Sequence, residues 1–223
     1  MAIDFESTSA NQFFSGSAVF SAAPFTVSAW MKFESIGDFC AFWVGDNTVS
    51  STGWLMRVDD SAPGGRVFRF RIESAGGTTQ VDSVITWNID TWYHCCIVEA
   101  SATDHRLYVN GTNKYTGTAS ITPGGTNSTA IGVRNSSTKA MYFDGIIAHV
   151  GVWNVVLTDE EVATLANKIS PLMVRRGSLV NYWPLNGNLA TEVDIVGGVN
   201  LTKNGTPALA EEPPIPYSRK MSV

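Results

Sequence analysis

Residues 25–33 read FTVSAWMKF, and this stretch constrains the fold more than any other. Alternate positions carry the apolar residues Phe25, Val27, Ala29, Met31 and Phe33, and the intervening positions carry Thr26, Ser28, Trp30 and Lys32. Because successive side chains of a strand point to opposite faces of its sheet, this pattern predicts a strand with one face in a core. A chain built from such segments must find its stability in packed sheets.

Further strand patterns follow at short intervals. They cover residues 66–72, 93–100, 105–111, 128–133 and 146–153, and residues 112–119 would return as a hairpin partner. The connections are rich in Gly, Ser, Asn and Asp, and Asn110-Gly111 favours a two-residue type I′ turn. Short strands with such turns predict an all-β, antiparallel sandwich.

One short helix is predicted after the last of these strands. Thr158 suits the N-cap position and Glu161 lies three residues later, which is the capping-box spacing. Pro171 would end any continuation. The acidic residues of this stretch are thereby explained as helix-capping groups without any chemistry.

Within residues 146–153 the alternation slips at Ala148 and His149. A bulge there would let Ile147, Val150 and Val152 all reach the interior, so we predict a bulged core strand.

The chain of 223 residues shows no domain boundary before about residue 170. We therefore expect one domain over residues 1–170 and a C-terminal extension over residues 171–223. The last part, EEPPIPYSRKMSV, is rich in proline and predicts an extended arm. It could pack on its own domain or on a neighbouring subunit, and the second case would give a homo-oligomer.

The composition argues against a nucleic-acid partner and against membrane insertion. The net charge of −5 and the lack of a lysine or arginine run argue against a nucleic-acid partner. No apolar stretch reaches the roughly 18 residues of a membrane helix, so no membrane insertion is expected. The N-terminus lacks the basic and apolar regions of a signal peptide, which predicts synthesis in the cytosol. Cys95 and Cys96 are neighbours in one strand and are expected to remain free, buried thiols.

Several separated segments resemble one family. FTVSAWMKF, WYHCCIV, RLYVNG, STAIGV and FDGIIAHVGVWNVVLTDEEV are similar, in order and spacing, to laminin-G-like domains of the concanavalin A-like lectin/glucanase superfamily. SLVNYWPLNGN, DIVGGVNLTKNGTPA and PPI resemble the C-terminal extension of members encoded by bacteriophages and environmental bacteria. The resemblance implies a jelly roll of two curved antiparallel sheets, with ligands on the concave face or the rim loops, often beside a calcium ion.

Four loop acids are candidate calcium ligands, because hard cations prefer oxygen donors: Asp144, Asp46, Asp59 and Asp60. Each could equally be a turn residue that bonds nearby backbone. The resemblance implies acids in the strand after FDG, and this chain instead has Ala148 and His149 there. That departure weakens the transfer of a metal site to this strand.

A ligand-binding patch is a second hypothesis. Its candidates are Trp30, Trp43, Arg57, Arg69 and Arg71, since flat rings stack on sugars and guanidinium groups suit acidic glycans. The competing interpretation places the tryptophans in the core and the arginines on solvated strand faces.

Catalysis is not predicted. Glycoside hydrolysis needs two carboxylates facing one sugar, and the nearest match to an E-x-D-x-x-E strand is Glu192-Val193-Asp194 followed by Gly197. The three histidines lack a nucleophile pattern, and we interpret His94 as a structural hydrogen-bonding residue. We therefore predict no catalytic residue.

The resulting prediction is a non-catalytic structural and binding module on a virion surface, as a bacteriophage capsid-decoration or tail-associated protein. Its expected partners are virion capsid or tail proteins, with host or environmental glycans as candidate ligands. The alternatives are a stand-alone soluble lectin and a glycoside hydrolase or lyase.

Overall fold

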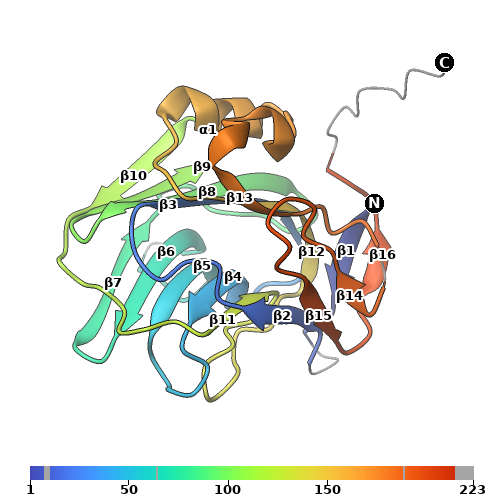
Figure 1. Ribbon diagram of the computed structural model, residues 1–223, viewed down its shortest axis with the longest axis horizontal. Helices are drawn as coiled ribbons and strands as arrows, with labels where there is room; N and C mark the ends of the chain where they lie inside the picture. Colours follow the sequence, from blue (N-terminus) through green and yellow to red (C-terminus); the bar gives the residue numbers. More distant parts are fainter. Residues whose placement is uncertain (8–10, 64, 188, 214–223) are drawn as a thin grey trace.

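The computed structural model describes residues 1–7, 11–63, 65–187 and 189–213. Within these residues the strands form two eight-stranded antiparallel sheets that lie face to face (Figure 1). Sheet I has the order β10-β9-β8-β3-β12-β1-β16, with β13 also paired to β12, and sheet II has the order β14-β15-β2-β11-β4-β5-β6-β7. This architecture confirms the predicted jelly-roll sandwich. The end of the predicted C-terminal arm, residues 214–223, lies outside the described residues.

The strands of sheet I are β1 (Ala2–Phe5), β3 (Phe25–Phe33), β8 (Trp92–Ser101), β9 (Asp104–Val109), β10 (Asn113–Gly117), β12 (Gly145–Trp153), β13 (Leu179–Trp183) and β16 (Ala208–Ala210). Those of sheet II are β2 (Phe13–Ser17), β4 (Phe39–Gly45), β5 (Gly53–Asp59), β6 (Val67–Ser74), β7 (Gly77–Asp82), β11 (Ser128–Ile131), β14 (Thr191–Glu192) and β15 (Leu201–Asn204). The helical segments are α1 (Asp159–Ala166) and the short 3₁₀ turns η1 (Pro171–Met173) and η2 (Arg176–Ser178).

The main core lies between the two sheets. All five apolar residues of the alternating stretch in β3 belong to it, as do Phe68, Phe70 and Ile72 of β6. The sequence pattern does not predict strands β4 and β5, because apolar side chains occupy both faces of each strand, as in Phe42-Trp43-Val44 and Trp54-Leu55-Met56. Their outer faces are covered by residues that include Val133, Met141 and Tyr142 from the segment after β11.

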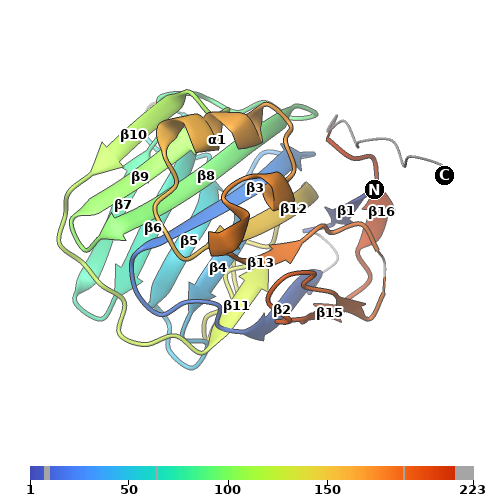
Figure 2. The ribbon, with the colours of Figure 1, turned by 45° about the horizontal axis from the view of Figure 1, so that its top comes forward.

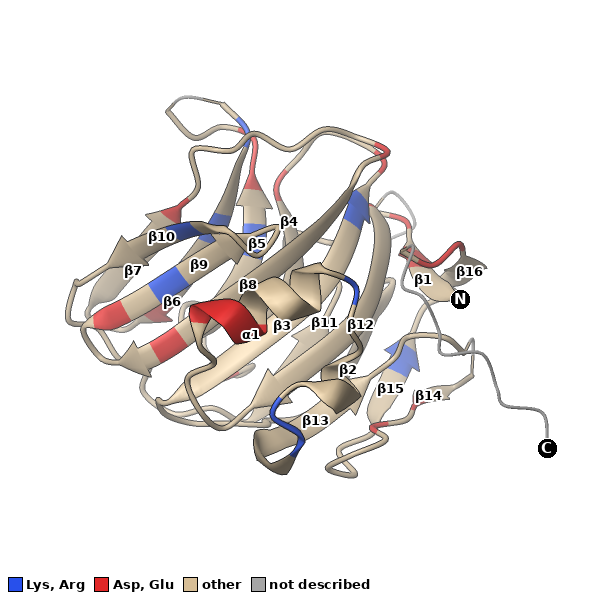
Figure 3. Cartoon of the chain, turned by 90° about the horizontal axis from the view of Figure 1, so that it is seen from above, with Lys and Arg blue, Asp and Glu red and all other residues tan. Residues whose placement is uncertain are grey.

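Helix α1 lies on the outer side of sheet I, over β8 (Figure 2). The predicted capping box is present: the backbone N–H of Thr158 donates to Glu161 over 2.8 Å, and that of Glu161 donates to Oγ1 of Thr158 over 3.3 Å. The red segment of α1 in Figure 3 is this acidic first turn. Val162 and Leu165 bury the opposite face of the helix.

Two local predictions concern a bulge in β12 and the hairpin turn between β9 and β10. The register of β12 with β3 shifts between Ala148 and Gly151, where His149 has φ +54°, so the predicted bulge is confirmed. Asn110 and Gly111 both have positive φ, as predicted. Because Val109 pairs directly with Asn113, however, the hairpin loop contains a third residue, and the predicted two-residue turn is wrong.

Much of the C-terminal extension is part of the sandwich. β13 pairs with β12, β15 with β2, and β16 with β1, so residues after 170 contribute strands to both sheets. Cys95 and Cys96 are free and buried, as expected. Among the described residues, no helix combines the length and apolarity that crossing a membrane requires.

Candidate functional site

The outer face of sheet II carries an ordered array of charged side chains. Strand pairing places them in cross-strand rows: Arg57, Arg69 and Asp82; then Trp43, Leu55, Arg71 and Gln80; then Gly53, Glu73 and Thr78. The rows share a face because side chains two residues apart on a strand point the same way. The alternation in β6 therefore brings Arg69, Arg71 and Glu73 together.

The first row is neutralised by aspartates. Nη2 of Arg57 lies 3.0 Å from Asp59 and 3.1 Å from Asp38. Arg69 binds Asp59 and makes two bonds of 2.6 and 2.7 Å to Asp82. Burial alone would raise the pKa of Asp59, but bonds from Ser61 and the charges of both arginines hold it below its ordinary value. Three aspartates therefore face two arginines, and this row has no excess positive charge.

The second charged group consists of Arg71, Glu73 and Arg134. Oε1 of Glu73 lies 2.9 Å from Nε of Arg71, and Oε2 accepts bonds of 3.0 and 2.8 Å from Arg134. The side chain of Glu73 is 2% exposed and that of Arg71 is 25% exposed. One buried carboxylate therefore forms ion pairs with two guanidinium groups, and part of the Arg71 side chain is accessible to solvent.

A depression of about 390 Å³ lies at the rim of sheet II beside this group. It is lined by Asp46, Val49, Ser50, Ser51, Thr52, Ser74, Ala75 and Gly124. Arg134 connects the two features, since Nη2 donates to the carbonyl oxygen of Ser50 and, over 3.3 Å, to the hydroxyl of Ser51. We call this feature the rim depression. Its serine, threonine and aspartate side chains could bond the hydroxyl groups of a polar ligand.

The predicted ligand-binding patch is only partly assembled. Arg57, Arg69 and Arg71 do share the outer face of sheet II, with Trp43. Trp43 is 0% exposed, so its ring offers no surface on which a sugar could stack. Trp30 belongs to the other sheet, where it is 8% exposed and packs against His94 with ring centroids 5.4 Å apart. The expectation that Trp30 joins the arginines is therefore wrong.

Two of the predicted metal ligands act as hydrogen-bond acceptors between loops. Asp144 accepts from the backbone of Ser7 over 3.0 Å and from the hydroxyl of Ser35. Asp46 accepts from the backbone and hydroxyl of Thr48 over 2.9 and 2.6 Å, and from Asn127 over 3.0 Å. Asp46 thus bonds the backbone two positions on, as a turn residue does, whereas Asp144 connects two segments that lie far from it in sequence.

Asp59 and Asp60, the other predicted ligands, lie close to Asp38. The three carboxylates have donor atoms within 4.8 Å of one another. Arg57 and Arg69 already place two positive charges against Asp59. A calcium ion does not fit this group, because it would lie beside both guanidinium groups.

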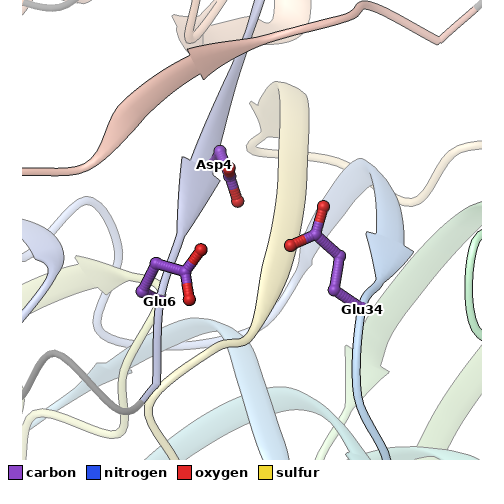
Figure 4. A group of neighbouring side chains, drawn as sticks. All are labelled: Asp4, Glu6 and Glu34. Carbon is purple, nitrogen blue, oxygen red and sulfur yellow. The ribbon is translucent and has the colours of Figure 1, made fainter.

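A different acidic group suits a hard cation better. Asp4 in β1, Glu6 just after β1 and Glu34 in the loop after β3 point toward one another, and their oxygens lie within 4.8 Å of one another (Figure 4). Oδ1 of Asp4 is buried and has no hydrogen-bond partner among the residues that the structure describes. Burial, followed by repulsion from neighbouring acids, raises the pKa of both Asp4 and Glu34. These three carboxylates could hold calcium, and the sequence alone offered no spacing that singles them out.

The nearest sequence match to a catalytic carboxylate pair has a structural role. Glu192 accepts the backbone N–H of Leu185 over 2.7 Å. Asp194 accepts the backbone N–H groups of Tyr182, Val196, Gly197 and Val199, all at 2.9–3.0 Å, and the amide of Asn181 at 2.6 Å. Both carboxylates are about 5% exposed and organise the loops of the C-terminal extension.

These features define a jelly-roll sandwich with a charged outer face and a polar rim depression. A family model described as "Concanavalin A-like lectin/glucanases superfamily" matches residues 6–163. The chain therefore belongs to this superfamily, in agreement with the laminin-G-like resemblance of its sequence. No curated protein sequence matches the chain.

Solved structures share the fold. A candidate carbohydrate-binding protein from Bacteroides ovatus superposes with a TM-score of 0.69 and 19% identity, over 95% of this chain and 60% of that one. This chain thus spans less than two thirds of that protein. The CBM40 of the Ruminococcus gnavus IT-sialidase, bound to α2,3-sialyllactose, superposes with a TM-score of 0.57 and 13% identity, over 74% of this chain and 96% of that one. A tailspike protein 2 domain of bacteriophage CBA120 superposes with a TM-score of 0.58 and 16% identity, over 77% of this chain and 28% of that one. The chain therefore has the fold of lectin-like carbohydrate-binding modules.

Proposed function

We propose that this chain is a non-catalytic glycan-binding module whose ligand occupies the rim depression. The observation that carries the proposal is the continuity of two features. Hydroxyl and carboxylate side chains line the depression, and Arg134 connects it to Glu73 on the outer face and, through that carboxylate, to Arg71. Sugars are held by such convergent polar groups. The fold shared with the candidate carbohydrate-binding protein from Bacteroides ovatus and with the CBM40 of the Ruminococcus gnavus IT-sialidase supports the same function.

A glycan array followed by titration calorimetry tests this proposal. Ala75 lies in an exposed turn of the rim depression, so Ala75→Trp should fill the site and weaken binding at least tenfold, or about 1.4 kcal/mol. Ala190→Trp is the matched control, because Ala190 is exposed beside β14 at the opposite edge of sheet II. Equal affinities of wild type and Ala75→Trp, or no bound glycan, would contradict the proposal.

The non-catalytic character has its own test. Glu192 and Asp194 are committed to backbone hydrogen bonds, which supports binding without cleavage. The purified chain should release no reducing sugar from a broad polysaccharide panel. Sustained release, lost when Glu192 is changed to Gln, would establish a hydrolase or lyase instead.

We further propose that the module works on a virion surface, as a capsid-decoration or tail-associated protein. Support comes from the phage-like C-terminal segment and from the fold shared with a domain of the bacteriophage CBA120 tailspike. Deleting residues 211–223 should abolish attachment to particles or self-association, while glycan binding persists. Unchanged assembly of the truncated chain, or a free monomer that binds glycans, would favour the stand-alone lectin.

A further inference from the structure

Arg71 differs from the other arginines on its face. Arg57, Arg69 and Arg134 each use at least one Nη atom in a bond to a carboxylate. Among the contacts of the described residues, Arg71 makes only the ion pair between Nε and Glu73, and its Nη atoms have no bond. Because a quarter of its side chain is exposed, a ligand could reach them.

The charge around Arg71 also differs from that of the neighbouring row. Arg57 and Arg69 are surrounded by three aspartates, Asp38, Asp59 and Asp82. Arg71 and Arg134 share the single carboxylate of Glu73. The two guanidinium groups and one carboxylate leave a net positive charge, so this end of the face attracts an anion.

We propose that the glycan recognised by this chain is acidic, and that its carboxylate or sulfate group binds the two Nη atoms of Arg71. A guanidinium group offers two parallel N–H donors that match two oxygens of such an anion. Gln80 is exposed and directly opposite Arg71 in β7; its amide nitrogen donates to Asp82 over 3.3 Å, and its amide oxygen can accept a bond from a neighbouring sugar hydroxyl. This inference rests on the proposed function and adds the chemical class of the ligand.

The rim depression sets the orientation of the ligand. Its wall contains Asp46, which repels an anion and accepts bonds from sugar hydroxyl groups. The neutral sugar residues therefore lie in the depression, and the anionic group lies on the outer face at Arg71. Arg134 holds Ser50 and Ser51 at the boundary between the two positions.

Titration calorimetry with matched glycans tests the inference. The probes are sialyllactose, a galacturonic acid trisaccharide and 3′-sulfolactose, each compared with its neutral counterpart. We expect at least one acidic probe to bind at least tenfold more tightly than its neutral counterpart, with an affinity that falls as sodium chloride rises. The carboxylated and sulfated arms identify which anion is preferred.

Arg71→Gln should remove at least tenfold of the affinity for the acidic probe and change neutral binding less than twofold. Arg71→Lys keeps the charge without the fork and should restore only part of the loss. Arg176→Gln changes the net charge equally at an exposed site and should have no effect. Thermal melts show whether each variant folds. If Arg71→Gln does not fold, Gln80→Ala takes its place, and we expect it to weaken binding of the acidic probe several-fold.

Binding of neutral glycans alone, or acidic binding that survives both the Arg71 and Gln80 substitutions, would overturn the inference and leave the proposed function standing. Absence of all glycan binding would overturn both.

Discussion

Nδ1 of His105 lies 2.5 Å from Oε2 of Glu99 between the two sheets. Nε2 of the same ring lies 2.7 Å from the carbonyl oxygen of Ala119, and Oε1 of Glu99 accepts from the indole of Trp54 over 3.2 Å. Since the carbonyl can only accept, Nε2 carries a proton, and a further proton must lie between Nδ1 and Glu99. The pair thus joins β8 and β9 to β5 and to the segment after β10, and it needs one shared proton.

This pair predicts that stability falls at alkaline pH. Burial lowers the pKa of His105, but its bonds to Glu99 and Ala119 outweigh burial and raise the pKa above the ordinary 6.5. Because the pKa of His105 is higher in the folded than in the unfolded protein, its protonation stabilises the fold. This stabilisation is complete below pH 6.5 and is lost as the pH rises through the folded-state pKa. Urea unfolding between pH 5.5 and 9 should show this decline.

Glu99→Gln should reverse that dependence. The amide of Gln can donate to a neutral His105, so the shared proton is no longer needed. Buried without a carboxylate partner, His105 would then resist protonation, and stability should fall as the pH drops below 6.5 instead of rising. The same pH dependence in wild type and Glu99→Gln would contradict the assignment.

Glu192 predicts a second effect in the same direction. Burial raises its pKa from 4.5 to about 7, so ionisation at higher pH destabilises the fold. Gln at this position can still accept the bond from Leu185. We expect Glu192→Gln to match wild type near pH 4 and to exceed it by up to about 3 kcal/mol in the free energy of unfolding near pH 9. Equal denaturation midpoints at both pH values would disprove this.

The glycine of the FDG motif is required by backbone geometry. Gly145 has φ +128°, and a Cβ atom there would collide with the carbonyl oxygen of Lys32 in β3. Gly145→Ala should therefore cost about 2–4 kcal/mol of stability, measured by chemical denaturation. Gly177→Ala is the control, because a Cβ at Gly177 would meet no atom within 4 Å. Similar losses in both variants would contradict this explanation.

The acidic group of Asp4, Glu6 and Glu34 predicts a response to calcium. Because mutual repulsion contributes to the raised pKa of Asp4 and Glu34, Asp4→Asn should increase the melting temperature in EDTA. Added calcium should stabilise wild type more than Asp4→Asn, since the variant has one ligand fewer. Equal calcium effects on the two proteins would show that the group does not hold the ion. Asp60→Asn, in the group beside Arg57, serves as the matched control.

Local pattern predicted the elements that alternate. The two faces of β3, the capping box at Thr158 and the bulge at His149 depend on residues close together in the chain, whose geometry follows from side-chain period and capping chemistry. The same period shows that Arg69 and Arg71 share a face and extends that face to Glu73. The same pattern does not identify strands β4 and β5, because both faces of each carry apolar side chains and the alternation is lost.

The composition of the site was decided by tertiary structure. Arg134 reaches Glu73 from a segment 61 residues away, and Trp30 and Trp43 lie on different sheets although both sit in aromatic strand-like sequence. Alternation shows that a strand has an apolar and a polar face, but it does not show which sheet the strand joins or which loop covers it. The sequence by itself therefore determined a laminin-G-like sandwich and the face of each alternating strand. Only long-range packing, which pairs each arginine with a particular acid, decided that the Nη atoms of Arg71 have no partner within the described part of the chain.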